Sequence, residues 1–323
     1  MRERVLYIDM AKGFAMITIV MLHVTLNNLE GDSCIMINSF NHSFNTRLLF
    51  FLSGMVAALG GAFSCNWKDI RKFVGKKVRT LLMPYIIWGV VVMPFVFEGN
   101  SIFDFDSILI SSFKPPFNGY WFLLYLFAIQ MLFLGIKVIS SRLSILVRND
   151  LVREVLVAVP FSLLLFPIYE YVLIFLLGYF FSNYWSRFLF SDVVQAVSFC
   201  LFIVLFTICR ENCREILRYI MALSAIIAIV GIMRRLSTPS NEYPNKFGEL
   251  LCNVGRHSLE IYLLHYSFTW IFRDMLVSVA NIYAIPLYLM IIVISTFICL
   301  LCCYIADGMK KIPYMSFLLF GGR

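Results

Sequence analysis

Two side chains in the first apolar segment, Lys12 and His23, have the types and the spacing to support group-transfer chemistry. They are eleven residues apart, close to three helical turns, so both would lie on one helix face with Cα atoms about 16 Å apart. Lys12 could hold the charged end of a long ligand while the imidazole meets its reactive end. Asp9 places an acid at the same mouth of the segment.

Each of these residues also has a structural interpretation. Lys12 could extend to the lipid headgroups and anchor the segment in its orientation. His23 is harder to explain in this way, because ionisable groups within a membrane are rare and usually face a bundle interior or a wet cavity. We therefore treat His23 as the candidate catalytic residue.

The second apolar segment carries two more candidates. Arg47, at its outer end, could clamp an acidic sugar or a developing oxyanion, or it could anchor the segment at the interface. Ser53 is followed by Gly54, and such small residues allow another helix to pack closely, with the serine hydroxyl bonded to a backbone carbonyl. That structural role is the simpler explanation for Ser53.

The ninth apolar segment contains a second membrane histidine, His265. It could form a site with His23 between the first and ninth segments, or it could belong to a buried hydrogen-bond network. Glu260 follows Arg256 by four residues, so the two are predicted to pair at the helix entrance.

The composition predicts an all-α membrane protein, because 61% of the residues are hydrophobic and only 14% are charged. With no long polar insert, residues 1–323 are expected to form a single membrane domain. Ten apolar segments predict about ten transmembrane helices in one bundle: 13–29, 48–63, 81–97, 120–139, 155–168, 171–185, 193–209, 216–233, 259–280 and 285–305.

The distribution of Lys and Arg predicts the orientation of the bundle. With a cytoplasmic N-terminus, 20 of the 27 basic residues fall on the cytoplasmic side, and ten spans return the C-terminus to that side. The net charge of +8 thus reflects topology, and no nucleic-acid-binding motif accompanies it. No metal-binding cluster is visible, so no metal is expected.

A basic stretch from Lys68 to Arg79 places six cations in twelve positions before the third apolar segment. Positive-inside topology explains it fully. Such a cluster would also attract the phosphates of a nucleotide-bearing donor, and Arg79, nearest the membrane, is the residue predicted to contact it.

Several stretches together resemble the acyltransferase 3 family of integral-membrane O-acyltransferases, in its sugar or polysaccharide O-acetyltransferase-like branch. They follow the order of the family along nearly the whole chain. The matching stretches are Tyr7–Gly13 with His23, Phe50–Gly54, Lys77 through Pro84, Tyr85 and Trp88, Trp121–Leu123, and Ser258–His265.

The resemblance implies acetyl-CoA as the usual donor, a glycan acceptor outside the cytoplasm or linked to lipid, and an essential histidine in the first span. It also implies a multi-pass protein of the bacterial inner membrane. His23 matches the essential histidine, and Trp121 belongs to a matching stretch. Lys12 stands where the family commonly has arginine, which keeps the charge but removes the bidentate fork.

These observations lead to one hypothesis and two alternatives. The hypothesis is an O-acyltransferase in which Lys12 and Arg79 bind acetyl-CoA and His23 is the general base for a glycan hydroxyl. The alternatives are an exporter or flippase of glycan material and a membrane scaffold with structural histidines. Neither of the alternatives requires Lys12 and His23 to share a helix face. The oligomeric state is not predicted.

Overall fold

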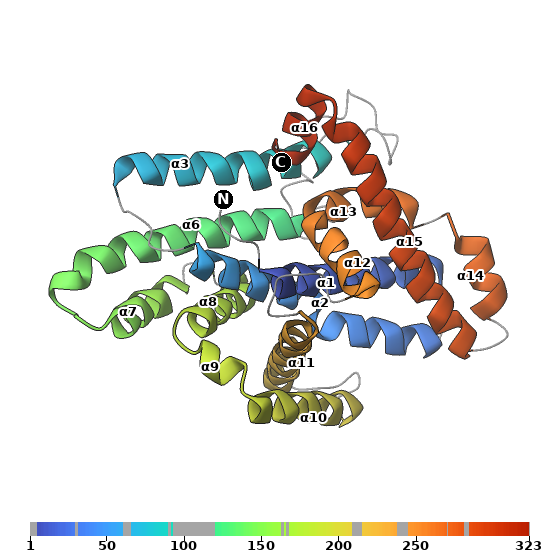
Figure 1. Cartoon of the computed structure of the whole chain (residues 1–323), viewed down its shortest axis with the longest axis horizontal. Coiled ribbons are helices and arrows are strands. Elements are labelled where there is room, and N and C mark those ends of the chain that lie inside the picture. The colour runs from blue at the N-terminus through green and yellow to red at the C-terminus, as the bar shows by residue number, and fades with distance from the viewer. Residues whose placement is uncertain are drawn as a thin grey trace. The chain divides into compact units, whose positions relative to one another are not determined.

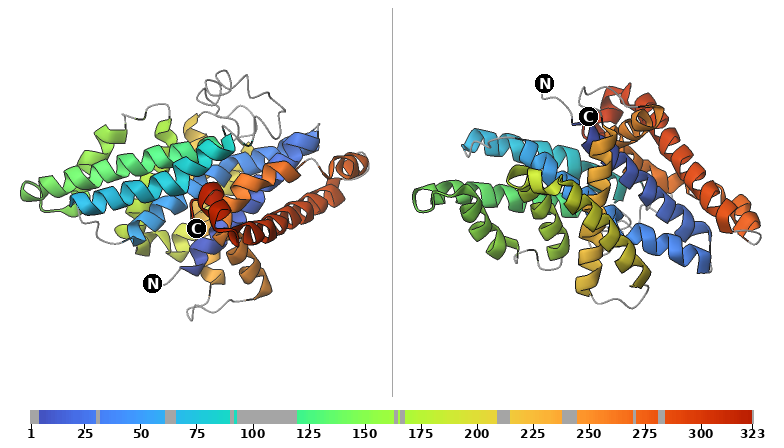
Figure 2. Two further views of the ribbon diagram at one scale, coloured as in Figure 1. Left: turned by 90° about the horizontal axis from the view of Figure 1, so that it is seen from above. Right: turned by 60° about the horizontal axis from the view of Figure 1, so that its bottom comes forward.

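The structure of the protein is a computed structural model that describes residues 5–29, 32–60, 66–89, 92, 120–162, 165, 168–208, 215–237, 245–269, 271–280 and 284–322. Within these ranges the chain forms helices and no strand, as the composition predicts. Figure 1 labels the helices along the chain, and Figure 2 shows them from two further directions.

The chain divides into two compact units. The first comprises Met1–Ser53 and Phe181–Asp307, and the second comprises Gly54–Phe180 and Gly308–Arg323, so the boundaries fall within α2, α8 and α15. The single domain predicted over residues 1–323 stays a prediction.

The helices that lie wholly or partly in the first unit are α1 (Leu6–Asn28), α2 (Asp32–Leu59), α8 (Tyr169–Asn183), α9 (Ser186–Leu189), α10 (Asp192–Ile208), α11 (Glu215–Leu236), α12 (Lys246–Arg256), α13 (Ser258–Leu264), α14 (Arg273–Ala280) and α15 (Ala284–Lys310). A 3₁₀ turn, His265–Phe268, follows α13.

The first unit is built around α1. This helix begins after the extended residue Val5, and its apolar side chains are buried along most of its length. It contacts α11, α12, α13, α14 and the 3₁₀ turn after α13. A helix that is apolar on all sides is expected at the centre of a bundle rather than at its surface, and α1 occupies such a position within its unit.

Two glycines bring α1 and α12 into backbone contact. A Cβ atom added to Gly13 would lie 2.0 Å from the carbonyl oxygen of Leu251, and one added to Gly255 would lie 1.8 Å from that of Asp9. Helices in a membrane associate closely where small residues let their backbones approach. The N-terminus of α12 is fixed by Asn245, whose side chain accepts a hydrogen bond from the Gly248 amide at 2.8 Å.

The second unit contains parts of α2, α8 and α15 together with α3 (Trp67–Lys77), α4 (Met83–Ile86), α6 (Trp121–Arg142), α7 (Asp150–Ser162) and α16 (Pro313–Phe320). A π-helical turn, Val78–Leu82, joins α3 to α4, and a 3₁₀ turn, Leu143–Ile145, follows α6. Helix α3 runs alongside α6 (Figures 1 and 2).

A compact polar network links α6, α7 and α8 in this second unit. Lys137 Nζ lies 2.5 Å from Glu154 Oε1 and 2.8 Å from the Tyr179 hydroxyl, which donates to Glu154 Oε2 at 2.9 Å. The three side chains satisfy one another's hydrogen-bonding groups, so a structural role in joining the three helices is enough to explain the network.

Four described helices are long and apolar enough to cross a membrane: Leu6–Asn28, Trp121–Arg142, Glu215–Leu236 and Leu287–Lys310. They correspond to the first, fourth, eighth and tenth predicted segments. Helix α10 is apolar but shorter. The count of ten spans and the cytoplasmic placement of both termini stay predictions.

The predicted ninth segment, residues 259–280, is not one continuous helix. Helix α13 ends at Leu264, the 3₁₀ turn follows, and α14 begins at Arg273. A break in an apolar segment is tolerated where neighbouring groups satisfy the backbone. Here the Asn28 side chain, from α1, donates to the carbonyl oxygen of Thr269 at 2.7 Å.

We predict that Gly255→Ala destabilises the protein, because the added methyl group must push α12 away from the backbone of α1. The melting temperature in detergent should fall by several degrees, corresponding to about 1–3 kcal/mol. Gly75→Ala in α3 is the matched control, because a Cβ at Gly75 meets nothing within 4 Å. Equal melting temperatures for the two variants would contradict this account of the α1–α12 contact.

Candidate active site

One end of α1 carries a carboxylate between two cations. Asp9 Oδ1 lies 4.0 Å from Lys12 Nζ, one turn along the same helix, and Asp9 Oδ2 lies 3.8 Å from Arg256 Nε at the end of α12. The backbone contact between these helices brings Arg256 to this position. The three side chains form a charged cluster, which suits a strongly polar ligand group.

Farther along α1, His23 lies beside His265. Their ring centroids are 5.1 Å apart, and the ring of Tyr266 lies edge-on to His23 at 5.8 Å. His23 is partly exposed, whereas His265 is only 3% exposed. The structure therefore brings together the histidines of the first and ninth predicted segments.

The hydrogen bonds of His265 define its neutral tautomer. Its Nδ1 lies 2.9 Å from the carbonyl oxygen of Ile261, which can only accept, so Nδ1 carries the proton. The other ring nitrogen, Nε2, then has a free lone pair. It is buried and has no hydrogen-bond partner among the described residues. A buried acceptor of this kind is uncommon, because leaving a polar atom unsatisfied costs free energy.

Three polar residues that sequence reasoning missed hold the two histidine-bearing segments together. Asn27 Nδ2 donates to the Thr269 hydroxyl at 2.9 Å, and Asn28 Nδ2 donates to the Thr269 carbonyl at 2.7 Å. Asn27 follows His23 by four residues and thus lies one turn beyond it. Two asparagines at the end of an apolar helix were the available signal, but their partner lies more than 240 residues away in the chain.

The candidates on α2 make local contacts. Arg47 Nη1 donates to the His42 carbonyl oxygen at 3.0 Å, and Ser53 Oγ donates to the Leu49 carbonyl oxygen at 2.8 Å. The second contact confirms the predicted bond from Ser53 to the backbone. Close packing at the adjacent Gly54 is also confirmed, since a Cβ there would lie 1.9 Å from the Phe175 carbonyl oxygen.

The remaining candidates lie in different parts of the fold. Glu260 is buried on α13, with 1% exposure. Arg79 is exposed in the π-helical turn of the second unit. Trp121 begins α6 in that unit and packs against Tyr125 and Tyr171, with ring centroids 5.1 and 5.4 Å away. The functional roles of all three stay predictions.

The described residues contain no group of three or more His, Cys, Asp or Glu side chains that could hold a metal ion.

Comparison with known proteins gives one family match. The model of a family described as an acyltransferase domain matches residues 5–307, which include both ends of the candidate site. No curated protein and no solved structure matches the chain.

We predict that His265 is an Nδ1–H tautomer at neutral pH, because its Nδ1 must donate to the Ile261 carbonyl. Nitrogen NMR of protein labelled with ¹⁵N-histidine should show a protonated Nδ1 and an unprotonated Nε2 for this residue. Loss of those signals in His265→Gln assigns them. Finding the proton on Nε2 instead would contradict the hydrogen-bond arrangement described here.

Proposed function

The chain belongs to the acyltransferase 3 family, and we propose that it transfers an acetyl group from acetyl-CoA to a hydroxyl of a glycan. The family and the four long apolar helices identify it as a membrane acyltransferase. The nature of the acyl group, the donor, the acceptor and the residues that perform the transfer are part of the proposal.

The observation that carries the proposal is the arrangement of α1. It holds a charged cluster at Asp9 and Lys12, and three turns away it holds His23 against the ring of His265. One rigid helix thus separates a ligand-holding end from an imidazole by about 16 Å. This separation suits a long donor with its charge at one end and its reactive group at the other.

In the proposed reaction His23 is the general base. Its unprotonated ring nitrogen takes the proton from the acceptor hydroxyl, whose oxygen attacks the carbonyl carbon of the thioester. The C–O bond forms, the C–S bond breaks, and the departing CoA thiolate takes the proton from the imidazolium. A neutral imidazole can perform both proton transfers, because its unprotonated ring nitrogen can accept a proton and then return it.

His265 is proposed as a positioning residue. With its Nδ1 bound to the Ile261 carbonyl, the ring is held in one orientation beside His23. The asparagine contacts to Thr269 keep its segment against α1. These contacts reduce the freedom of His23 before the substrates arrive, which is how a supporting shell of side chains contributes to a reaction.

The donor is proposed to enter from the cytoplasm and to be held by Lys12, with Arg79 as a second predicted contact. The acceptor is proposed to be a surface glycan or its lipid-linked precursor, approached from the other side of the bacterial inner membrane. Asp9 would hold Lys12 in place, and Arg47, Ser53, Trp121 and Glu260 are proposed as supporting residues.

We predict that His23→Ala abolishes glycan acetylation, because no other group replaces the base; a loss of about 10²–10⁴-fold is usual for removing such a group. NMR of the O-acetyl groups on surface polysaccharide, with protein levels measured in the membrane fraction, provides the test. His42→Ala is the matched control, since this histidine is exposed on α2. Full acetylation in a well-expressed His23→Ala strain would refute the role. In a strain that lacks the protein, unchanged product chemistry with polymer trapped inside the cell would indicate an exporter.

We predict that Lys12→Ala raises the KM for acetyl-CoA by about tenfold with a smaller effect on kcat, because a lost charge contact weakens donor binding. Lys12→Arg keeps the charge and should retain most of the affinity. Lys246→Ala, at an exposed lysine of α12, is the control. A fall in kcat with an unchanged KM would contradict a role in donor binding.

A further inference from the structure

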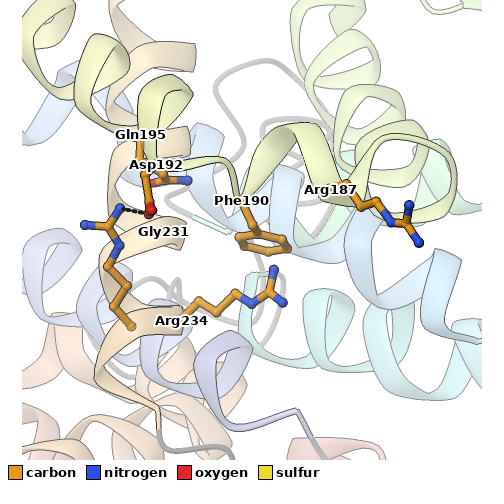
Figure 3. A pocket seen from close by; sticks show the side chains of 7 residues that line it. Arg187, Phe190, Asp192, Gln195, Gly231 and Arg234 are labelled. Carbon is orange, nitrogen blue, oxygen red and sulfur yellow. Dashed lines mark hydrogen bonds and ion pairs between the residues drawn. The ribbon is translucent and has the colours of Figure 1, made fainter.

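A cavity of about 400 Å³ in the first unit is lined by three arginines. It lies where α9, α10 and α11 meet, and Figure 3 shows its side chains from close by. Arg187 comes from α9, and Arg234 and Arg235 come from the last turn of α11. The volume is within the usual range for small-molecule sites.

The charges around the cavity are unequal. Arg235 Nη2 lies 2.6 Å from Asp192 Oδ1, which is the one carboxylate among the lining residues. The guanidinium carbon of Arg234 lies 3.8 Å from the centroid of the Phe190 ring, and the side chain of Arg187 lies apart from that ring and points away from it (Figure 3). In the part of the chain that the structure describes, no carboxylate pairs with Arg187 or Arg234, so two positive charges remain available for an anion.

Helices α10 and α11 pack closely against each other at the cavity. Gln195, at 6% exposure, donates from Nε2 to the Leu189 carbonyl oxygen at 2.7 Å and so fixes the turn between α9 and α10. A Cβ added to Gly231 would collide with this glutamine side chain. The glycine therefore lets α10 and α11 approach closely enough to bring the arginines of α11 to the same cavity as Arg187 of α9.

An aromatic contact connects the cavity to the candidate active site. The ring of Tyr7, near the start of α1, meets the ring of Phe190 edge-on with centroids 5.7 Å apart. Tyr7 is two residues before Asp9. The cavity thus adjoins the end of α1 that carries the charged cluster, and the predicted topology turns this end toward the cytoplasm.

We infer that this cavity binds the phosphate groups of the CoA portion of the donor, with Arg187 and Arg234 as the phosphate ligands. The inference rests on the proposed function and extends it to a second contact region. Guanidinium groups bind phosphate oxygens through paired, charge-assisted hydrogen bonds. The rest of the donor would then pass Lys12 and follow α1 toward His23.

Binding measurements on the full chain in nanodiscs of neutral lipid test the inference. The probes are CoA, adenosine 3′,5′-bisphosphate, which keeps phosphates but lacks the pantetheine arm, and pantetheine, which lacks phosphates. In Arg187→Ala/Arg234→Ala the dissociation constants of both phosphate-bearing probes should rise by at least about tenfold, with pantetheine affected little. Arg218→Ala, an exposed arginine in the first turn of α11, is the matched control and should bind like the wild type.

A second double variant distinguishes the loss of phosphate contacts from misfolding. Arg187→Lys/Arg234→Lys keeps both charges while removing the guanidinium forks, so its affinity for the phosphate-bearing probes should fall between those of the wild type and the double alanine variant. Raising the salt concentration should weaken the binding of these probes to the wild type, because exposed charge contacts are screened.

The outcomes separate this inference from the proposed function. Unchanged affinity for CoA in the double variants overturns the phosphate site and leaves acetyl-CoA as the proposed donor. Failure of the wild type to bind CoA overturns the donor itself. If anionic lipid in the nanodisc raises the melting temperature of the wild type but not of the alanine variant, while CoA affinity is equal in both, the cavity holds a lipid headgroup and the inference is wrong.

Discussion

The backbone contact between α1 and α12 is the constraint on which the first unit depends. Gly13 and Gly255 carry no side chains, so the two helices meet carbonyl against Cα rather than through interdigitated side chains. This approach sets Arg256 beside Asp9. Because α13 and the 3₁₀ turn continue from α12, it also directs the following segment along α1, so that His265 reaches His23. The crossing of α1 and α12 therefore positions both ends of the candidate site. No single side chain in the site could position both.

Polar groups in the two units differ in how fully they are satisfied. The hydroxyls of Thr18 and Thr25 return to carbonyl oxygens of their own helix, and Lys137, Glu154 and Tyr179 satisfy one another. These hydrogen bonds offset the free-energy cost of burying polar atoms, so a structural role is enough to explain these residues. Several buried side-chain atoms depart from this pattern because they have no hydrogen-bond partner among the described residues, and His265 Nε2 is the one that belongs to an imidazole. An unsatisfied basic nitrogen beside a second imidazole is a reason to place chemistry here rather than at the lysine network.

The sequence predicted those features that depend on local spacing. A helical period placed Lys12 and His23 on one face, small residues predicted close packing at Gly54, and two membrane histidines indicated proximity of the first and ninth segments. What it missed depends on contacts distant in the chain. The pairing of Arg256 with Glu260, predicted because they are four residues apart, stays a prediction. The contact of Arg256 with Asp9 was missed because it requires the α1–α12 crossing. The break after Leu264 was missed because hydropathy does not record which side chain, here Asn28, satisfies the backbone beyond the turn.

The geometry of α1 also limits the kind of donor that fits the proposed reaction. The charged cluster and His23 are separated by an apolar helix that cannot shorten, because its residues are packed on several sides and its hydrogen bonds fix the rise per residue. A compact acyl donor whose charge lies next to its reactive carbon would reach the cluster or the imidazole but would not contact both. A donor with a long neutral arm between its phosphates and its thioester can do so. The inferred phosphate site in the arginine cavity beside Tyr7 would lengthen the charged end still further. Both features therefore favour a donor built like a coenzyme A thioester over an acyl phosphate.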